Sequence, residues 1–274
     1  MDKDREEQTQ ENSNDEMDWD AFFKSDDDEE WEKEKAKKKK RRSLIVKLVS
    51  LLLVVSMTVT GLQVWFNVFN LPAIRFVEVS NRLSNQHEVK EYRKAVVTIE
   101  WAGVKGTGFT VDSSGLIVTN EHVVNHTNTV TVQYRSGDSY TGKVIAKDAN
   151  LDIAIVDIEA TNLPTLELDN ADKDWSNEKI MFIGNPLSFT QIANEGEIKG
   201  NVVLRDWEVP VMMIEAPIYR GNSGSPVINK DGKVIGVIFA TLPNPTIETE
   251  EIVGLAVPSS HILKLLEEVE FKTE

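Results

Sequence analysis

The chain has 274 residues, of which 41% are hydrophobic, and it carries a formal net charge of −15. A chain of this length and apolar content can bury a sizeable core. The absence of cysteine excludes a disulfide scaffold, a thiol nucleophile and a Cys-ligated metal site. The acidic balance argues against nonspecific nucleic-acid binding, which needs a basic surface. With only four histidines, we expect neither a metal nor a cofactor.

The N-terminal region is strongly acidic. Residues 1–34 hold 16 acidic and four basic side chains and show no apolar periodicity. Such a segment buries too little apolar area to offset its ordering entropy. We therefore expect residues 1–42 to form a disordered cytoplasmic tail that ends in the basic cluster 35–42. The alternative to a merely solvated tail is docking onto a cytoplasmic partner through its embedded aromatic residues.

An apolar run follows the basic cluster. It extends from Leu44 to Phe66 and is interrupted only by Lys47, which lies near the basic end and can snorkel to the headgroups. A run of this length can cross a hydrocarbon core of about 30 Å. It predicts a transmembrane anchor helix over 43–67, in preference to a cleaved signal peptide or a buried core helix. The basic cluster places the N-terminus in the cytoplasm and the chain from about residue 70 outside a cell membrane, which we expect to be bacterial.

Residues 68–91 show few strong patterns and are expected to form a stalk. From about residue 92, short runs rich in Val, Ile and Thr alternate with turn residues, which predicts an all-β barrel or sandwich. The final apolar residues recur at helical spacing, so residues 259–270 are expected to form a closing helix.

One candidate site lies in the run Gly221-Asn222-Ser223-Gly224. Flanking glycines allow a tight turn that presents a serine hydroxyl outward. In such a turn the N–H groups of Gly221 and Ser223 can point at one spot, where a tetrahedral oxyanion would form. The alternative is an ordinary turn before a strand.

Two further candidates precede this serine. His122 follows an apolar run, and an imidazole is well suited to deprotonate a serine hydroxyl. Asp152 stands at the edge of an apolar strand, where a carboxylate can orient an imidazole. Taken alone, each has a structural alternative, namely a histidine that caps a helical turn and an aspartate in a solvated turn. Together they occur in the order His, Asp, Ser of a chymotrypsin-like arrangement.

The sequence around these residues resembles the HtrA/DegP-type trypsin-like serine proteases. The resemblance is carried by GTGFTVDSSGLIVTNEHVV, NLDIAIVDI, IYRGNSGSPVINKDGKVIGV, IGNP, EGEIKG and GLAVPSSHI, which occur in order across residues 92–268. It implies a serine endopeptidase domain over 92–274 with a chymotrypsin-like double six-stranded β-barrel. Barrel 1 is expected over about 92–165 and barrel 2 over about 170–258.

The same resemblance assigns roles to the candidate residues. Ser223 would be the nucleophile, His122 the general base and Asp152 the residue that orients it, and the amides of Gly221 and Ser223 would form the oxyanion hole. The substrate pocket would be walled by Pro217, Ile218, Gly254, Leu255 and Ala256. Pro217 stands where selection for Lys or Arg would need an acidic residue, so we expect a preference for a small or medium apolar residue.

Two features depart from the family pattern. We expect no PDZ domain after the protease segment, and therefore no PDZ-based substrate capture. Ser225 stands where the family usually has glycine, and we interpret it as a tolerated variant.

The leading hypothesis is a membrane-tethered serine endopeptidase that cuts unfolded or exposed proteins on the extracytoplasmic side. The alternatives are a protease-fold chaperone or scaffold without turnover, and a protease that rests inactive until it is triggered. HtrA-type domains often form homotrimers through their N-terminal segment, here residues 68–92, but these residues show no decisive pattern.

Overall fold

The computed structural model describes residues 26–68, 78–171, 173–186, 189–205, 207–243 and 252–273. The chain divides into two compact units, Met1–Asn70 and Leu71–Glu274. The acidic residues before 26, part of the expected tail, lie outside the described residues.

The first unit contains the helix α2 (Asp26–Val68). Its segment Glu30–Gln63 is long and apolar enough to cross a membrane, and its most apolar window is 0% buried. The helix begins well before the apolar run, so residues 26–42 are helical where we expected a disordered tail. Side chains one turn apart support this extension: the Lys38 ammonium lies 3.0 Å from the Glu34 carboxylate, and the Lys35 ammonium lies 3.1 Å from the centre of the Trp31 ring.

The first described residues of the second unit, 78–83, are helical, and the helix α4 (His87–Ala95) follows them. Leu83 and Val89 are buried in the main hydrophobic cluster. The buried Arg93 guanidinium donates to the hydroxyls of Ser84 (2.6 Å) and Ser80 (3.1 Å). Residues 79–91 are therefore packed onto the domain and do not form the stalk expected over 68–91, of which residues 69–77 lie outside the described residues.

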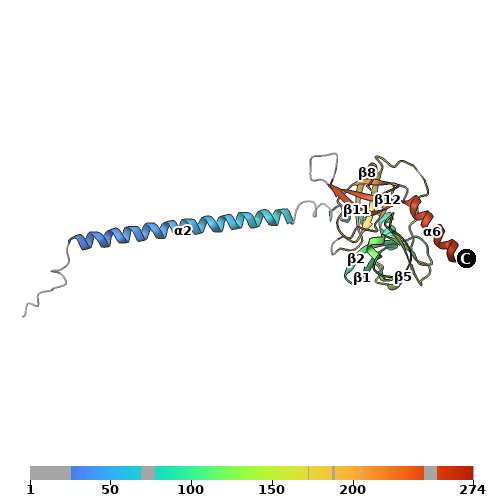
Figure 1. Ribbon diagram of the computed structural model, residues 1–274, viewed down its shortest axis with the longest axis horizontal. Coiled ribbons are helices and arrows are strands. Elements are labelled where there is room, and N and C mark those ends of the chain that lie inside the picture. The colour runs from blue at the N-terminus through green and yellow to red at the C-terminus, as the bar shows by residue number, and fades with distance from the viewer. Residues whose placement is uncertain are drawn as a thin grey trace, which may run out of the picture. The chain divides into compact units, whose positions relative to one another are not determined.

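In the part of the chain that the structure describes, twelve strands form two closed barrels of six strands each, which confirms the expected fold class. Figure 1 labels β1, β2 and β5 of one barrel and β8, β11 and β12 of the other. Barrel 1 has the order β1-β2-β3-β6-β5-β4, with β1 (Val96–Trp101), β2 (Val104–Thr110), β3 (Leu116–Thr119), β4 (Thr129–Gln133), β5 (Ser139–Asp148) and β6 (Ile153–Ile158). Barrel 2 repeats this order as β7-β8-β9-β12-β11-β10, with β7 (Lys179–Gly184), β8 (Ile192–Val203), β9 (Pro210–Glu215), β10 (Pro226–Ile228), β11 (Val234–Pro243) and β12 (Ile252–Pro258).

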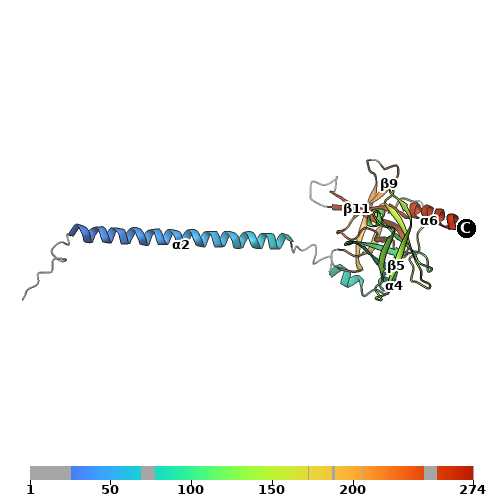
Figure 2. The same cartoon turned by 60° about the horizontal axis from the view of Figure 1, so that its bottom comes forward.

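Each barrel has its own apolar core, and a third cluster joins the two barrels. Along β4 the burial alternates, because successive strand residues face opposite sides of the sheet. The terminal helix α6 (Ser259–Thr273) contacts β5 of barrel 1 and both β11 and β12 of barrel 2 (Figure 2). The helix therefore closes the domain across both barrels.

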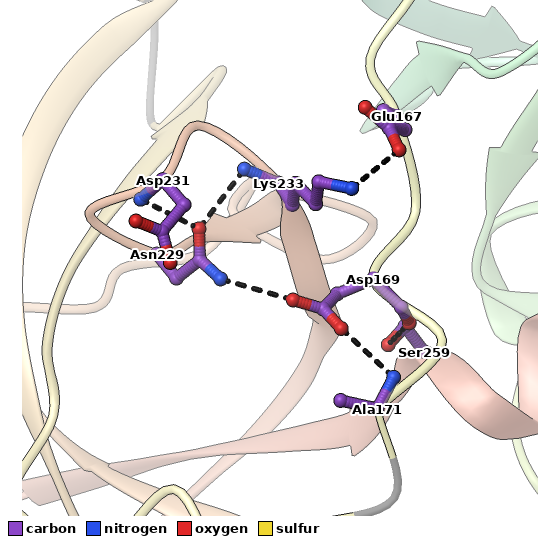
Figure 3. A network of polar contacts seen from close by, with 7 residues as sticks. All are labelled: Glu167, Asp169, Ala171, Asn229, Asp231, Lys233 and Ser259. Carbon is purple, nitrogen blue, oxygen red and sulfur yellow. Dashed lines mark hydrogen bonds and ion pairs between the residues drawn. The ribbon is translucent and has the colours of Figure 1, made fainter.

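The linker between the barrels, residues 159–178, is held in place by a network of polar contacts (Figure 3). The Asp169 carboxylate accepts hydrogen bonds from the amide N–H of Ala171 (2.8 Å) and the side-chain amide of Asn229 (3.2 Å). The Ser259 hydroxyl donates to the backbone carbonyl of Asp169 at 2.6 Å. The Lys233 ammonium lies 2.5 Å from the Glu167 carboxylate. These contacts tie the linker to the hairpin between β10 and β11 and to the start of α6.

Candidate active site

The end of β3 and the start of β6 bring His122 and Asp152 together. Thr119 of β3 pairs with Ala154 of β6, so the residues that flank this pair are neighbours. His122 lies in the short helix α5 (Glu121–Val124), directly after β3. Its Nδ1 is 2.7 Å from Oδ2 of Asp152, and its backbone N–H donates to Oδ1 of the same carboxylate at 2.8 Å. Both oxygens of Asp152 therefore face His122.

The backbone of Asp152 has an unusual conformation. Its φ is +52°, in the left-handed region that only a few non-glycine residues adopt. The side-chain amide of Asn120 donates to the Asp152 carbonyl at 2.7 Å, which holds this conformation from the barrel side. The Asp152 side chain is 16% exposed and the His122 side chain 43%, so the imidazole is the more accessible partner.

The contact with Asp152 raises the pKa of His122 above its ordinary value. The hydrogen bond that His122 donates to Asp152 is the largest cause, and the charges of Asp152 and Glu121 act in the same direction, whereas burial of the imidazole opposes them. An imidazole oriented in this way can accept a proton at Nε2, and the carboxylate then stabilises the imidazolium.

Ser223 lies in a tight turn at the start of β10. The amide of Asn222 donates to the carbonyl of Tyr219 at 3.0 Å, and the amide of Ser225 donates to the carbonyl of Asn222 at 2.9 Å. Gly221 has a φ of +99°, and Gly224, beyond the serine, has a φ of +85°, a region that glycine adopts without strain. Within this turn Ser223 is half-buried, while its immediate neighbours are buried. The turn therefore leaves the serine accessible.

Thr107 of β2 joins this turn to barrel 1. Its backbone N–H donates to the Ser223 carbonyl at 2.9 Å, and its hydroxyl donates to the Gly221 carbonyl at 2.7 Å. The Thr107 carbonyl in turn accepts from the hydroxyl of Thr119, three residues before His122, at 2.7 Å. A chain of hydrogen bonds thus runs from the serine turn in barrel 2 to the strand end that carries His122 in barrel 1.

The backbone N–H groups of the turn differ in their hydrogen bonding. Within the described residues, neither Gly221 N–H nor Ser223 N–H donates to a partner. The next residues are anchored: Gly224 N–H donates to the Ile238 carbonyl at 2.8 Å, and Ile238 N–H donates to the Ser225 carbonyl at 3.0 Å. The turn is thus fixed on its barrel side.

β11 presents an open edge next to this turn. β10 pairs with β11 only as far as Val237, whereas β12 continues along the other edge as far as Pro243. Among the described strands, none pairs with residues 239–243 on the side where β10 ends. An extended peptide can add to such an edge by main-chain hydrogen bonds.

The five residues expected to wall the substrate pocket fall into two groups. Pro217 and Ile218 line a cavity of about 1090 Å³, which Val253 and Leu83 also line. Ile218 lies against β12, since a Cβ added to Gly254 would fall 1.9 Å from its Cδ1. Leu255 and Ala256 are buried in the hydrophobic clusters. None of the three β12 residues lines that cavity, and Gly254 lies against Ile218 of the loop that precedes the serine.

Sequence reasoning missed Thr107, Asn120 and Asn185. The Asn185 amide N–H donates to the Thr107 hydroxyl at 3.0 Å, and its side chain donates to the Val97 carbonyl at 2.9 Å. All three are buried and uncharged. Thr107 and Asn120 stand within the quoted block around His122, but their partners lie 114 and 32 residues away, and nothing in a single sequence identifies such contacts.

Comparisons with known proteins agree with this geometry. Residues 106–237 match the trypsin-like peptidase domain family. A crystal structure of the serine endoprotease from Yersinia pestis superposes with a TM-score of 0.57 and 26% sequence identity, covering 66% of this chain and 65% of that one. Residues 106–237 are thus similar to the trypsin-like peptidase domain, and the double-barrel fold agrees with this similarity.

Curated relatives indicate which kind of serine protease the matched part of the chain resembles. A probable periplasmic serine endoprotease, DegP-like, from Chlamydia muridarum is 36% identical over 174 residues, which is 61% of this chain and 34% of the relative. Serine protease HTRA1A from Danio rerio is 34% identical over 188 residues, 66% of this chain and 38% of the relative. The matched part of the chain is therefore similar to serine proteases of the HtrA/DegP type, and it spans about a third of the length of these relatives.

Proposed function

We propose that the chain is a serine endopeptidase in which Ser223, His122 and Asp152 form the catalytic triad. The observation that carries the proposal is the pairing of His122 with Asp152 at 2.7 Å, on a strand end that is hydrogen-bonded through Thr107 to the Ser223 turn. The curated relatives, which are serine endoproteases by name, support the same activity.

The chemistry follows from the roles of these groups. Ser223 Oγ attacks the carbonyl carbon of the scissile peptide bond while Nε2 of His122 takes the hydroxyl proton. The negative charge on the carbonyl oxygen is stabilised by the N–H groups of Gly221 and Ser223. The tetrahedral intermediate collapses, the C–N bond breaks, and the imidazolium gives its proton to the leaving amine. Water, deprotonated by His122, then hydrolyses the acyl-enzyme and releases Ser223.

The substrate would bind as an extended strand along residues 239–243 of β11, which favours unfolded or exposed segments of proteins. The residue before the scissile bond would meet Ile218 and Gly254. Because Pro217 and Ile218 offer no anion there, the pocket suits a small or medium apolar side chain.

The anchor would be α2. Its apolar segment crosses the membrane, and its basic residues 35–42 remain in the cytoplasm according to the positive-inside rule. The protease domain then acts on the extracytoplasmic side, in agreement with the word periplasmic in the names of the DegP-like relatives.

Labelling with a fluorophosphonate probe tests the activity. The full chain in mild detergent is compared with its Ser223→Ala variant. We expect the probe to label the wild type and not the variant, because only an activated serine attacks phosphorus. If neither protein is labelled, even with unfolded substrate protein added, the alternative of a protease-fold scaffold without turnover replaces the proposal.

A topology measurement tests the anchor separately. A membrane-impermeant protease applied to intact cells should digest an epitope tag placed after residue 274 and spare a tag placed before residue 1. The opposite pattern would reverse the proposed orientation, and release of the chain by alkaline carbonate would contradict a membrane-spanning helix.

A further inference from the structure

Asn120 occupies a special position between β3 and α5. It is fully buried and stands two residues before His122. It takes the N-cap position of α5, where an asparagine side chain usually accepts a hydrogen bond from the helix. Here its side chain makes no such bond. The Asn120 side chain therefore does not act as a helix cap.

The side-chain amide of Asn120 is directed at Asp152. It donates to the Asp152 carbonyl at 2.7 Å, while both carboxylate oxygens of the same residue accept hydrogen bonds from His122. The segment 120–122 thus holds Asp152 at its backbone and at its side chain simultaneously. Since the left-handed φ of +52° costs free energy in an aspartate, a contact that stabilises this backbone keeps the carboxylate in place.

The side-chain oxygen of Asn120 shows that packing alone does not explain why an asparagine stands at this position. Oδ1 of Asn120 is buried and has no hydrogen-bond partner among the described residues. A buried acceptor without a partner is unfavourable, and an apolar side chain of similar shape would avoid that cost. The amide donor is what an apolar side chain could not supply.

We propose that Asn120 is a positioning residue, whose side-chain amide fixes the backbone of Asp152 so that the carboxylate faces Nδ1 of His122. The proposal rests on the proposed function, because it assigns Asn120 a role in the same site. Asn120 itself takes no part in bond making or breaking.

The charges around His122 determine how its pKa should change when the side-chain amide of Asn120 is removed. Asp152 and Glu121 raise the pKa of His122, and burial of the imidazole lowers it. Lys147 of β5 lies at the other end of α5, where its ammonium donates to the carbonyls of Val124 (2.9 Å) and Asn125 (3.2 Å). When the carboxylate moves away, the largest favourable contact weakens, and the pKa of His122 falls toward its ordinary value.

The test compares Asn120→Ala with Asn194→Ala in the full chain in detergent. Asn194 is a matched control, because it is also buried, in β8, and its side-chain nitrogen has no partner among the described residues. A second variant, Asn120→Leu, keeps the branched shape without the donor in case the alanine variant does not fold. The measurements are the rate of fluorophosphonate labelling, thermal unfolding, and NMR titration of ¹³C-labelled imidazoles.

We expect the Asn120 variants to be labelled about tenfold more slowly than the wild type, the loss that corresponds to one positioning hydrogen bond. The His122 titration should move to lower pH in these variants and stay unchanged in Asn194→Ala. The chain has four histidines, so a His122→Gln variant identifies the relevant signal. If the Asn120 variants lose thermal stability but keep the wild-type rate and titration, Asn120 is only structural and the proposal is wrong.

The two proposals fail in distinguishable ways. Absence of labelling in the wild type contradicts the proposed peptidase activity. The titration of His122 still decides the role of Asn120 in that case, since it reports on the contact between His122 and Asp152 without turnover.

Discussion

The backbone N–H of Thr107 donates a 2.9 Å hydrogen bond to the carbonyl oxygen of Ser223, across the boundary between the two barrels. The hydroxyl of the same threonine binds the Gly221 carbonyl at 2.7 Å. One buried residue of barrel 1 therefore holds both residues whose amides are proposed to form the oxyanion hole, Ser223 through its backbone N–H and Gly221 through its hydroxyl. The position of this hole depends on how the two barrels meet.

Replacement of Thr107 by valine should slow the reaction of Ser223 with the probe, while the protein still folds. Valine keeps the shape and the backbone N–H but removes the hydroxyl, so the Gly221 carbonyl and the Asn185 amide lose a partner. We expect a loss of stability of about 1–3 kcal/mol, typical of a buried group left without its partner. Fluorophosphonate labelling should slow by at least tenfold, because Gly221 is no longer held.

Thr110→Val is the control for this change. The Thr110 hydroxyl is also buried, and it lies 2.7 Å from the Tyr134 hydroxyl inside barrel 1. This variant should lose similar stability but keep the wild-type labelling rate. Equal rates for both variants would show that Thr107 does not support the serine turn.

Replacement of Gly224 by alanine should abolish labelling. The residue has a φ of +85°, and an added Cβ would lie 1.8 Å from the Thr107 carbonyl oxygen. The backbone must shift to relieve this clash, and Ser223 shifts with it. We expect a loss of several kcal/mol in the free energy of unfolding, of the order seen for severe strain in a core. Denaturant unfolding and labelling measure the two effects.

Gly137→Ala separates the clash from the backbone strain. Gly137 has a φ of +99°, and its added Cβ would meet nothing within 4 Å. The strain alone costs about 1 kcal/mol, and labelling should be unaffected. A Gly224→Ala variant as stable and as reactive as Gly137→Ala would mean that the serine turn adapts easily.

The sequence predicted much of this arrangement because barrels and triads leave local patterns. Alternating Val, Ile and Thr runs between turn residues indicated the strands, and the glycines around Ser223 indicated its turn. The helix over residues 26–42 does not follow from the charge pattern, because high net charge is typical of disorder, whereas ion pairs one turn apart, such as Glu34 with Lys38, support a helix. Thr107 and Asn120 were missed because their roles arise from pairing between distant segments, which leaves no local signal.

Truncation of Ile218 should change the preferred residue before the scissile bond. Ile218 lies against Gly254, so Ile218→Ala should enlarge the proposed pocket. We expect cleavage to shift from small apolar residues toward larger ones such as Phe, with a change of roughly 1–3 kcal/mol in relative specificity, or about 10–200-fold. Profiling with a peptide library, read out by mass spectrometry, measures the shift.

Ile180→Ala serves as the comparison, because Ile180 lines the same cavity from β7, whereas the atom nearest to a Cβ added at Gly254 belongs to Ile218. Its cleavage profile should remain that of the wild type. If both variants, or neither, change the profile, Ile218 does not select the residue before the scissile bond.

The reactivity of Ser223 should depend on pH through His122. Only the neutral imidazole can accept a proton, and its pKa is raised above the ordinary 6.5, chiefly by the hydrogen bond to Asp152. Labelling should therefore increase with pH through a midpoint above 6.5. In Asp152→Asn the midpoint should fall and the maximal rate should drop by up to about 10⁴-fold, as in related triads. A midpoint that is the same in both proteins would mean that Asp152 does not act on His122.

The same pair should affect stability with a definite sign. A histidine whose folded pKa is raised contributes stability that is fully present below its unfolded pKa and is lost as the pH rises through the folded value. The difference in Tm between the wild type and His122→Gln should therefore be larger near pH 6 than near pH 9. His126→Gln is the control, since His126 contacts Trp101 and no carboxylate among the described residues. A Tm difference for His122→Gln that grows with pH would contradict the charge pairing of His122 with Asp152.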